Sequence, residues 1–270
     1  MNTNPVKTIL KAGGTAVGSE VSRFRSADIP RIYAAAGCDF VFIDMEHSSF
    51  SLETVADMIE SARRSNIVPI VRVPQAEYAF VARVLDCGAQ GIIVPRVNTP
   101  EQVEQIVSWV RYPPAGIRGF ACNTAQTDGQ PVSAESFIQT ANRETLLAIQ
   151  IERREAVANL EAMLSIEGVD VACLGFMDLT VDLGIPGQLD HPTAVAAVQR
   201  MVDVANDNGV APGIIAADMN VVTEWMSRGM RFVSFATDEI LLQRSVTESI
   251  GQLRRSGEEA AAEQPLSQLQ

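Results

Sequence analysis

The chain has 270 residues, of which 47% are hydrophobic and 20% are charged, and its formal net charge is −12. A chain of this length buries one large core, as a single α/β barrel or as two small domains. An acidic surface repels nucleic acid and anionic membranes, so neither is an expected partner. With no long apolar leader, no membrane-length apolar run and four widely spaced cysteines, we expect a soluble cytoplasmic protein with free thiols.

Short β-rich runs alternate with helical patterns from end to end. The predicted strands are residues 15–21, 40–45, 68–73, 91–97, 146–152, 169–174, 211–216 and 231–237. Most are continuous apolar runs, as expected for parallel strands that are covered on both faces. Because no Pro/Gly/Ser-rich linker separates two halves, the pattern favours one (β/α)8 barrel over residues 1–255, with an open doubly wound sheet as the alternative.

Helices are predicted between the strands, at residues 51–65, 99–110, 155–164, 191–208 and 220–229. Ser51 and Thr99 are typical N-cap residues, and Pro100 suits the first helical position. The polar, Gly-rich segment 111–141 is expected to form a loop over the barrel mouth and one helix. Residues 256–270 lack apolar periodicity and are predicted to be a disordered polar tail.

Ionisable and polar side chains follow several of the predicted strands. Active sites of such barrels gather at the carboxyl ends of the strands, where this chain places Asp44, Glu46, His47, Arg72, Gln150, Glu152 and Asp178. A single carboxylate at a strand end can equally cap the following helix. Several such groups on one rim favour a functional site, because buried charges are costly unless they are paired or bound to metal.

Two acidic residues are candidates for metal ligands. Glu152 and Asp178 follow adjacent strands, so their oxygens can converge on Mg²⁺ or Mn²⁺. Zinc is disfavoured, because the chain has only two histidines and no Cys/His ligand spacing. His191 begins a predicted helix and is interpreted as structural. His47 directly follows a strand end and is the candidate base near neutral pH.

The scarcity of lysines and the lack of phosphate- and nucleotide-binding motifs exclude several classes of reaction. The only lysines are Lys7 and Lys11, so no barrel strand offers a Schiff-base amine. Aldol chemistry would therefore rely on a metal and Arg72 to stabilise an enolate. The last two strands lack Gly-rich phosphate-binding turns, and no nucleotide-binding motif is present, so neither a sugar phosphate nor a nucleotide cofactor is expected.

Eight sequence blocks in order resemble the HpcH/HpaI aldolases, the class II pyruvate aldolases. The resemblance covers roughly residues 10–250. It includes AAAGCDFVFIDMEHSSFSLETV, VRVP, RVLDCGAQGIIVPRVNTPEQV, RYPPAGIRG, QIERREAVANLEAMLSIEGVDVACLGFMDLTVDLG, HPTAVAAV, GVAPGI and GMRFVSFATD. It implies a barrel that assembles into homohexamers from dimers that exchange their last helix.

The resemblance also implies roles for individual residues. Glu152 and Asp178 correspond to ligands of a divalent cation, which is Mg²⁺, Mn²⁺ or Co²⁺. His47 corresponds to the catalytic base, polarised by Asp44. Asp86 corresponds to a further orienting residue that acts from the subunit interface.

The substrate-binding residues are implied in the same way. Arg72 matches the arginine that holds the keto oxygen of pyruvate, and Gln150 matches a polar group beside the metal. The backbone amides of Gly175, Phe176 and Met177 correspond to the loop that binds the pyruvate carboxylate. Because relatives commonly have smaller residues after the glycine, Phe176 and Met177 are expected to place a bulkier wall beside this pocket.

The implied reaction cleaves a 4-hydroxy-2-keto acid to pyruvate and an aldehyde. His47 would remove the 4-hydroxyl proton through a metal-bound water, and the metal and Arg72 would hold the enolate. Two alternatives remain open: an acyl-CoA lyase of the citryl- or malyl-CoA type, and a non-catalytic oligomeric barrel. Arg23 and Arg25 follow the first strand, where they would either bind an acidic acceptor or coenzyme A, or pair with nearby carboxylates.

Overall fold

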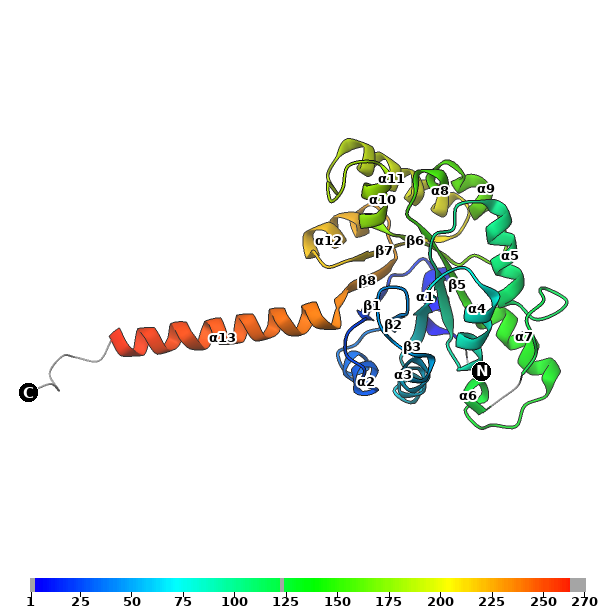
Figure 1. Cartoon of the computed structure of the whole chain (residues 1–270), viewed down its shortest axis with the longest axis horizontal. Coiled ribbons are helices and arrows are strands. Elements are labelled where there is room, and N and C mark those ends of the chain that lie inside the picture. The colour runs from blue at the N-terminus through cyan, green and yellow to red at the C-terminus, as the bar shows by residue number, and fades with distance from the viewer. Residues whose placement is uncertain (1–2, 122–123, 263–270) are drawn as a thin grey trace, which may run out of the picture.

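Eight parallel strands close into a barrel in sequence order, with β8 returning to β1 (Figure 1). The computed structural model describes residues 3–121 and 124–262. Its strands are β1 (Ala16–Val21), β2 (Phe40–Asp44), β3 (Val68–Arg72), β4 (Gly91–Val94), β5 (Leu146–Ile151), β6 (Val171–Leu174), β7 (Ala211–Ala216) and β8 (Phe232–Thr237). The predicted (β/α)8 barrel is confirmed, and each observed strand lies within its predicted range.

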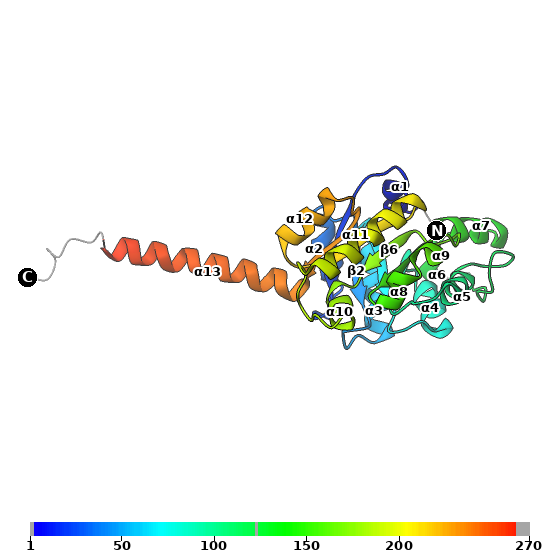
Figure 2. The same ribbon diagram turned by 90° about the horizontal axis from the view of Figure 1, so that it is seen from above.

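Helices pack around the barrel, and most of them cover the outer faces of its strands (Figures 1 and 2). They are α1 (Pro5–Lys11), α2 (Asp28–Ala35), α3 (Leu52–Arg64), α4 (Tyr78–Asp86), α5 (Pro100–Val110), α6 (Thr124–Thr127), α7 (Ala134–Glu144), α8 (Arg154–Ala158), α9 (Leu160–Leu164), α10 (Phe176–Asp182), α11 (Pro192–Asp207), α12 (Met219–Ser227) and α13 (Asp238–Ala262). Within the described residues, no helix combines the length and apolar character needed to cross a membrane.

Capping side chains begin the helices where the sequence predicts. Ser51 caps α3, and Thr99 forms a capping box at the start of α5. The predicted helix 155–164 is instead divided into α8 and α9 at Asn159. The side-chain amide of Asn159 donates a hydrogen bond to the carbonyl of Asn98, 2.8 Å away, and so ties this break to the loop after β4.

The barrel interior changes character along the strands. Near the strand starts it is apolar, and the rings of Phe40 and Phe232 stack with centroids 4.4 Å apart. At the strand ends it carries the buried polar side chains of Asp44, Arg72 and Gln150. This difference places the chemistry at the carboxyl ends of the strands, as the fold class predicts.

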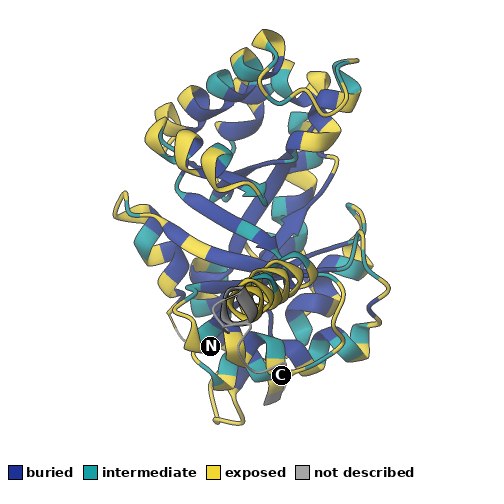
Figure 3. Ribbon diagram, turned by 90° about the vertical axis from the view of Figure 1, so that its left-hand side faces the viewer, coloured by how far each residue is buried: buried dark blue, intermediate teal, exposed yellow. Residues whose placement is uncertain are grey.

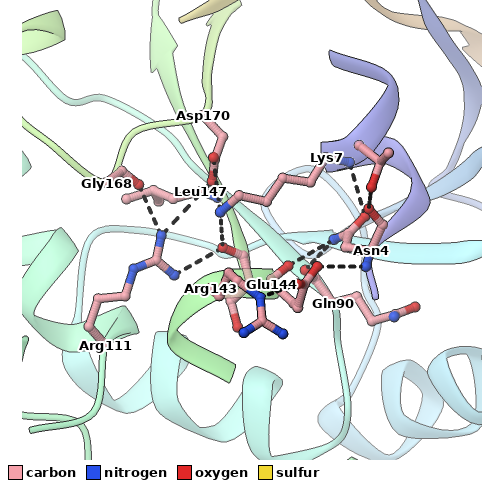
Figure 4. A network of polar contacts seen from close by, with 11 residues as sticks. Asn4, Lys7, Gln90, Arg111, Arg143, Glu144, Leu147, Gly168 and Asp170 are labelled. Atoms are coloured by element: carbon pink, nitrogen blue, oxygen red, sulfur yellow. Dashed lines mark hydrogen bonds and ion pairs between the residues drawn. The ribbon is translucent and has the colours of Figure 1, made fainter. Parts of the chain in front are cut away.

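Helix α1 closes the opposite end of the barrel through a buried polar network (Figure 4). The Asn4 side chain donates to the carbonyls of Gln90 and Glu144, at 3.0 and 3.2 Å. Lys7 Nζ lies 3.0 Å from Asp170 and donates to the carbonyl of Thr145. Burial lowers the pKa of Lys7, although Asp170 opposes this shift. Both lysines of the chain therefore lie on a helix at the end of the barrel remote from the strand ends.

The segment 111–141 lies at this closed end, and the prediction that it forms a loop over the mouth is wrong. Arg118 binds Asp86, the last residue of α4, at 2.8 Å. Arg63, near the end of α3, binds Asp128 at 2.6 Å. Each helix that follows a strand returns the chain to the level where strands begin, so the segment after α5 starts at that level.

Helix α13 leaves the barrel and extends away from it (Figures 1 and 2), and most of its residues are exposed (Figure 3). The predicted disordered tail is therefore wrong for residues 256–262, where Glu and Ala favour helix; residues 263–270 lie outside the described residues. The exposed large apolar side chains of α13 are Leu242, Val246, Ile250 and Leu253. Their spacing places them along one face of the helix.

Candidate active site

The centre of the site is a buried ion pair between the last residues of β2 and β3. Asp44 and Arg72 are register partners, and Arg72 Nε donates to Asp44 Oδ1 at 2.8 Å. Asp44 also accepts the backbone N–H groups of Glu46 and His47, at 2.9 and 3.1 Å. Burial opposes the charge of Arg72, but Asp44, together with Glu20 and Glu46, more than compensates, and the pKa of Arg72 is raised. Arg72 is therefore held as a fixed cation at the barrel mouth.

Nη1 of Arg72 faces β5, and Nε, which binds Asp44, also lies near Glu46. Nη1 donates to Gln150 Oε1 at 3.3 Å, and Nε lies 3.4 Å from Glu46 Oε2. Nη2 has no hydrogen-bond partner among the described residues. The guanidinium thus keeps a donor available beside two groups that fix its plane.

Gln150 connects Arg72 to the predicted metal ligand Glu152. Its side-chain amide donates to Glu152 Oε2. Glu152 Oε1 accepts the backbone N–H of Arg96 at 2.7 Å. Arg96 has a φ of 58°, an uncommon conformation for a residue other than glycine, and this conformation accompanies the hydrogen bond to Glu152.

Glu46 joins both arginines and lies close to the predicted base. Its Oε1 lies 2.9 Å from Arg96 Nη2, and its Oε2 lies 3.7 Å from His47 Nε2. Burial raises the pKa of Glu46, although the three neighbouring bases favour its charged form. The imidazole of His47 is half exposed, which suits a group that exchanges protons with substrate or water.

The acidic residues predicted to bind metal lie on adjacent connections of the barrel. Glu152 follows β5, and Asp178 lies in the first turn of α10. Burial raises the pKa of Glu152; the bonds from Arg96 and Gln150 oppose this shift, and the charges of Glu46 and Asp178 add to it. A divalent cation would relieve this repulsion.

The donor set fits a hard cation that keeps much of its water. Among the described residues, no three His, Cys, Asp or Glu side chains are grouped as a metal site would require. Two carboxylates plus water and substrate oxygens are typical of Mg²⁺ and Mn²⁺. Glu152 and Asp178 therefore fit a Mg²⁺ or Mn²⁺ ion that also binds water and substrate. The described residues do not fit a metal ion whose ligands all come from protein side chains.

Gly175 allows the helix after β6 to approach Glu152. A Cβ at this position would lie 2.5 Å from Glu152 Oε2 and 2.8 Å from Gln150 Nε2. The N-terminal amides of α10 receive no side-chain cap. Phe176 turns away and packs edge-on against Trp225, with ring centroids 6.3 Å apart, so the predicted wall beside the pocket is wrong for Phe176. Met177 is exposed.

Two predicted orienting contacts differ from the structure. Asp44 binds the backbone N–H of His47, whereas the carboxylate nearest to the imidazole belongs to Glu46. Asp86 lies at the closed end of the barrel, where it accepts hydrogen bonds from Arg118 and Gln126, each at 2.8 Å. Within one chain, Asp86 therefore lies far along α4 from the mouth.

The arginines after β1 are engaged with their neighbours. Arg23 Nε lies 2.9 Å from Glu239 on α13, and Arg25 donates to the hydroxyl of Ser49 at 2.6 Å. Both side chains are accessible at these contacts. Arg23 therefore pairs with a nearby carboxylate, as one of the two predicted alternatives states. Arg25 instead binds a neutral partner.

Two residues of this cluster were absent from the predicted site. Arg96 was assigned to the interior of the fourth strand, although Pro95, which lacks an N–H, was a signal that the strand ends before it. Glu20 lies inside the barrel and is 7% exposed. Its alternation with Ala16 and Gly18 along β1 was a signal that it faces inward.

Comparison with known proteins relates this geometry to a family. Residues 23–244 match the family described as HpcH/HpaI aldolase/citrate lyase. The chain is 35% identical over 241 residues to a hydroxypyruvate/pyruvate aldolase of Roseobacter denitrificans, covering 88% of this chain and 93% of that one. It is 32% identical over 262 residues to a 4-hydroxy-2-oxo-heptane-1,7-dioate aldolase of Escherichia coli, covering 97% and 98% of the two chains. The crystal structure of an HpcH/HpaI aldolase from Desulfitobacterium hafniense matches with a TM-score of 0.87 and 32% identity, over 92% of this chain and 96% of the other. The chain therefore belongs to the HpcH/HpaI aldolase/citrate lyase family.

Proposed function

We propose that the protein is a divalent-metal-dependent lyase that cleaves a 4-hydroxy-2-keto acid to pyruvate and an aldehyde. The observation that carries this proposal is the hydrogen-bonded line from Arg72 through Gln150 to Glu152. It sets a free guanidinium donor beside a carboxylate suited to a hard cation, so both can act on one keto oxygen. The relatives named as aldolases of pyruvate and of a hydroxy-oxo-dioate support the same class of reaction.

Glu152 and Asp178 would hold the cation, which is Mg²⁺, Mn²⁺ or Co²⁺. When bound, it supplies positive charge that stabilises developing negative charge on the keto oxygen. Gln150 fixes Glu152 through a hydrogen bond and so orients it. The start of α10 suits the substrate carboxylate, because the amides of Phe176 and Met177 receive no side-chain cap; the Gly175 amide donates to the carbonyl of Ile151 at 3.0 Å.

Arg72 and His47 would act directly on the reacting atoms. Arg72 donates through Nη2 to the keto oxygen and stabilises the enolate that forms when the C3–C4 bond breaks. His47, accessible at the mouth, accepts the proton of the 4-hydroxyl group. Asp44 holds Arg72 and the backbone of His47 in place. An imine route is unavailable, because both lysines lie on α1 at the closed end.

An acyl-CoA substrate is less well supported. Its diphosphate would call for a basic patch at the mouth, where Arg23 and Arg25 are the candidates. Arg23 already pairs with Glu239, and the chain as a whole is strongly acidic. A non-catalytic barrel is also less well supported, because Arg72, Glu152, Asp178 and His47 are all retained.

We also propose that the chain works as a homo-oligomer, in the hexameric arrangement that the family implies. Within the part of the chain that the structure describes, nothing covers the apolar face of α13, and a second copy would bury it. Asp86 lines a hollow of about 770 Å³ on the outer surface, beside α3 and α4. A neighbouring subunit at this surface would bring Asp86 toward another copy's mouth.

The free thiols of Cys38, Cys87 and Cys173 support a cytoplasmic location.

The experiment is an assay of pyruvate release from a panel of 4-hydroxy-2-keto acids, with Mg²⁺, Mn²⁺ or Co²⁺ and after exhaustive EDTA treatment. Glu152→Gln and Asp178→Asn should abolish release, and the control Glu161→Gln, on the exposed face of α9, should retain it. Full activity in EDTA would refute metal dependence. Failure of every substrate in the panel would refute the aldolase itself.

The same assay tests the base. His47→Ala should lower the cleavage rate by about two to four orders of magnitude, the usual contribution of general acid–base catalysis. Pyruvate should still bind, because Arg72 and both carboxylates remain. Turnover near that of the unsubstituted chain would assign the base to another group.

A further inference from the structure

Glu20 is a buried carboxyl group on the inner wall of the barrel. It lies on β1 two residues after Gly18, where an added Cβ would touch the ring of Phe40 inside the barrel. Alternate residues of a strand face the same side, so Glu20 also faces inward. It is 7% exposed, and its carboxyl group makes no hydrogen bond with any described residue. A buried carboxyl without a partner is costly and calls for a reason.

Glu20 lies just below the catalytic guanidinium. Its register partner is Phe42 on β2, and Arg72 lies over the ring of Phe42, 5.1 Å from its centroid. The ionisable groups whose charges act on Glu20 are Arg72, Asp44 and Asp238. Glu20 in turn acts on Cys173 across the barrel and on Tyr33 outside it. It therefore belongs to the floor of the site.

The bound keto acid would present its third carbon to this wall. In the binding mode proposed above, groups that follow β3, β5 and β6 would hold its carboxylate and keto oxygen, and C3 would then project toward the half of the barrel formed by β1, β2 and β8. On that half, Asp44 binds Arg72, and Asp238 accepts backbone N–H groups of Ser22, Arg23 and Phe24. Glu20 is the carboxyl there that no described residue engages.

We propose that Glu20 is the proton donor to C3 of the pyruvate enolate, a role that rests on the function proposed above. When the C3–C4 bond breaks, its electron pair passes to the enolate, and the 4-hydroxyl oxygen, having given its proton to His47, becomes the aldehyde oxygen. The enolate then takes the proton of Glu20: a C3–H bond forms from the C2=C3 electrons, and the keto group is restored. Glu20 is left as a carboxylate. It regains a proton from water, and His47 returns one to water, so protons balance over the cycle.

The environment of Glu20 suits this role. Burial raises its pKa to about 7, although Arg72 opposes the shift. A carboxyl group that holds its proton near neutral pH is an efficient general acid, because its pKa matches the operating pH. In the reverse direction, the same carboxylate removes a methyl proton from pyruvate.

The test is exchange of the pyruvate methyl protons with deuterium oxide, followed by proton NMR in the presence of Mg²⁺ and without any aldehyde. Glu20→Gln should slow this exchange by about two to four orders of magnitude. Glu20→Asp, which keeps the acid on a shorter side chain, should retain more exchange than Glu20→Gln. Ser234→Ala is the matched control: this buried interior hydroxyl has no hydrogen-bond partner among the described residues, and its loss should leave exchange unchanged.

Two further measurements separate the outcomes. Pyruvate affinity, measured by calorimetry, should be unchanged in Glu20→Gln; loss of binding together with exchange would overturn the proton-donor role in favour of a structural one. Exchange at the unsubstituted rate in Glu20→Gln would overturn it as well. If the unsubstituted chain exchanges pyruvate protons but cleaves no 4-hydroxy-2-keto acid, the aldolase proposal fails instead.

Discussion

At the scale of single residues, one guanidinium faces several carboxylates. Arg72 binds Asp44 directly and lies 3.4 Å from Glu46. When Glu20 is ionised, its charge also raises the pKa of Arg72. The negative charges of Asp44 and Glu46 hold the guanidinium in a fixed position and keep it charged. The planar shape of the guanidinium is as important as its charge, because it fixes the angle between the hydrogen bonds that Nε donates to Asp44 and Nη1 donates to Gln150.

Arg72→Lys should therefore impair the site although it conserves charge. A single ammonium group cannot bind Asp44 and Gln150 and still donate to a keto oxygen. We expect kcat/KM for cleavage to fall by at least about two orders of magnitude, equivalent to about 2.7 kcal/mol of transition-state stabilisation. Steady-state kinetics measure this, with Arg64→Lys, an exposed pair with Glu60, as the control. Equal kinetics in the two variants would contradict the role of the planar group.

The buried acid of β1 should also affect stability. The pKa of Glu20 is about 7 in the folded chain, above its ordinary value of 4.5, so folding favours the protonated form. Its stabilisation is complete below about pH 4.5 and is lost as pH rises through about 7. We expect the free energy of unfolding, measured in EDTA, to fall between pH 5 and pH 8. The fall should be up to about 3 kcal/mol larger for the unsubstituted chain than for Glu20→Gln. Urea denaturation at both pH values measures this, and parallel losses would contradict it.

At the scale of elements, the end of β4 explains what the sequence could and could not predict. The run 91–97 was predicted as one strand because its residues are mainly apolar. The strand stops at Val94, and Arg96 takes a left-handed conformation that directs its N–H to Glu152. The apolar pattern of a sequence locates its strands, because burial determines which strand positions must be apolar. A hydrogen bond to a residue 56 positions away leaves no such pattern.

The junction of β6 and α10 depends on the same packing. Gly175→Ala should displace Glu152 and Gln150, since the new Cβ would lie less than 3.0 Å from both. We expect weaker Mn²⁺ binding and a fall in kcat of at least about tenfold, with little unfolding, because only the polar end of the barrel must move. Metal titration and kinetics measure this. Gly251→Ala is the control, because a Cβ there meets only the end of the Arg255 side chain, 3.4 Å away; a normal metal affinity in Gly175→Ala would contradict the expectation.

At the scale of the whole molecule, the chain is a barrel with one extended helix. Sequence patterning predicted the barrel because its strands are covered on both faces within one chain. It failed for residues 256–262 at the end of α13, where no apolar pattern marks the helix. The apolar residues of α13 come earlier and are spaced along a face that the described residues leave open. The periodicity of a helix can be read from sequence, but the partner that covers it cannot. The same limit applies to Asp86, whose predicted role requires a second subunit.

Substitution on the apolar face of α13 should change the oligomeric state. Val246→Asp would place a charge in the buried seam between copies, and light scattering after gel filtration should detect smaller species. Gln252→Asp adds the same charge outside the apolar face, beside Glu248, and should leave the assembly unchanged. Val246→Asp should keep its own barrel folded, because Val246 is half exposed in the single chain. An unchanged mass for Val246→Asp would contradict assembly through α13.

The placement of the lysines has a practical consequence for attaching the protein to a surface. Reagents that couple to amines can reach exposed Lys11, whereas Lys7 is buried against Asp170. Both lie on the helix that closes the barrel at the end remote from His47 and Arg72. Amine coupling to a resin or sensor chip should therefore attach a copy through the closed end of its barrel, with the catalytic mouth of that copy directed toward the solution and without an engineered tag.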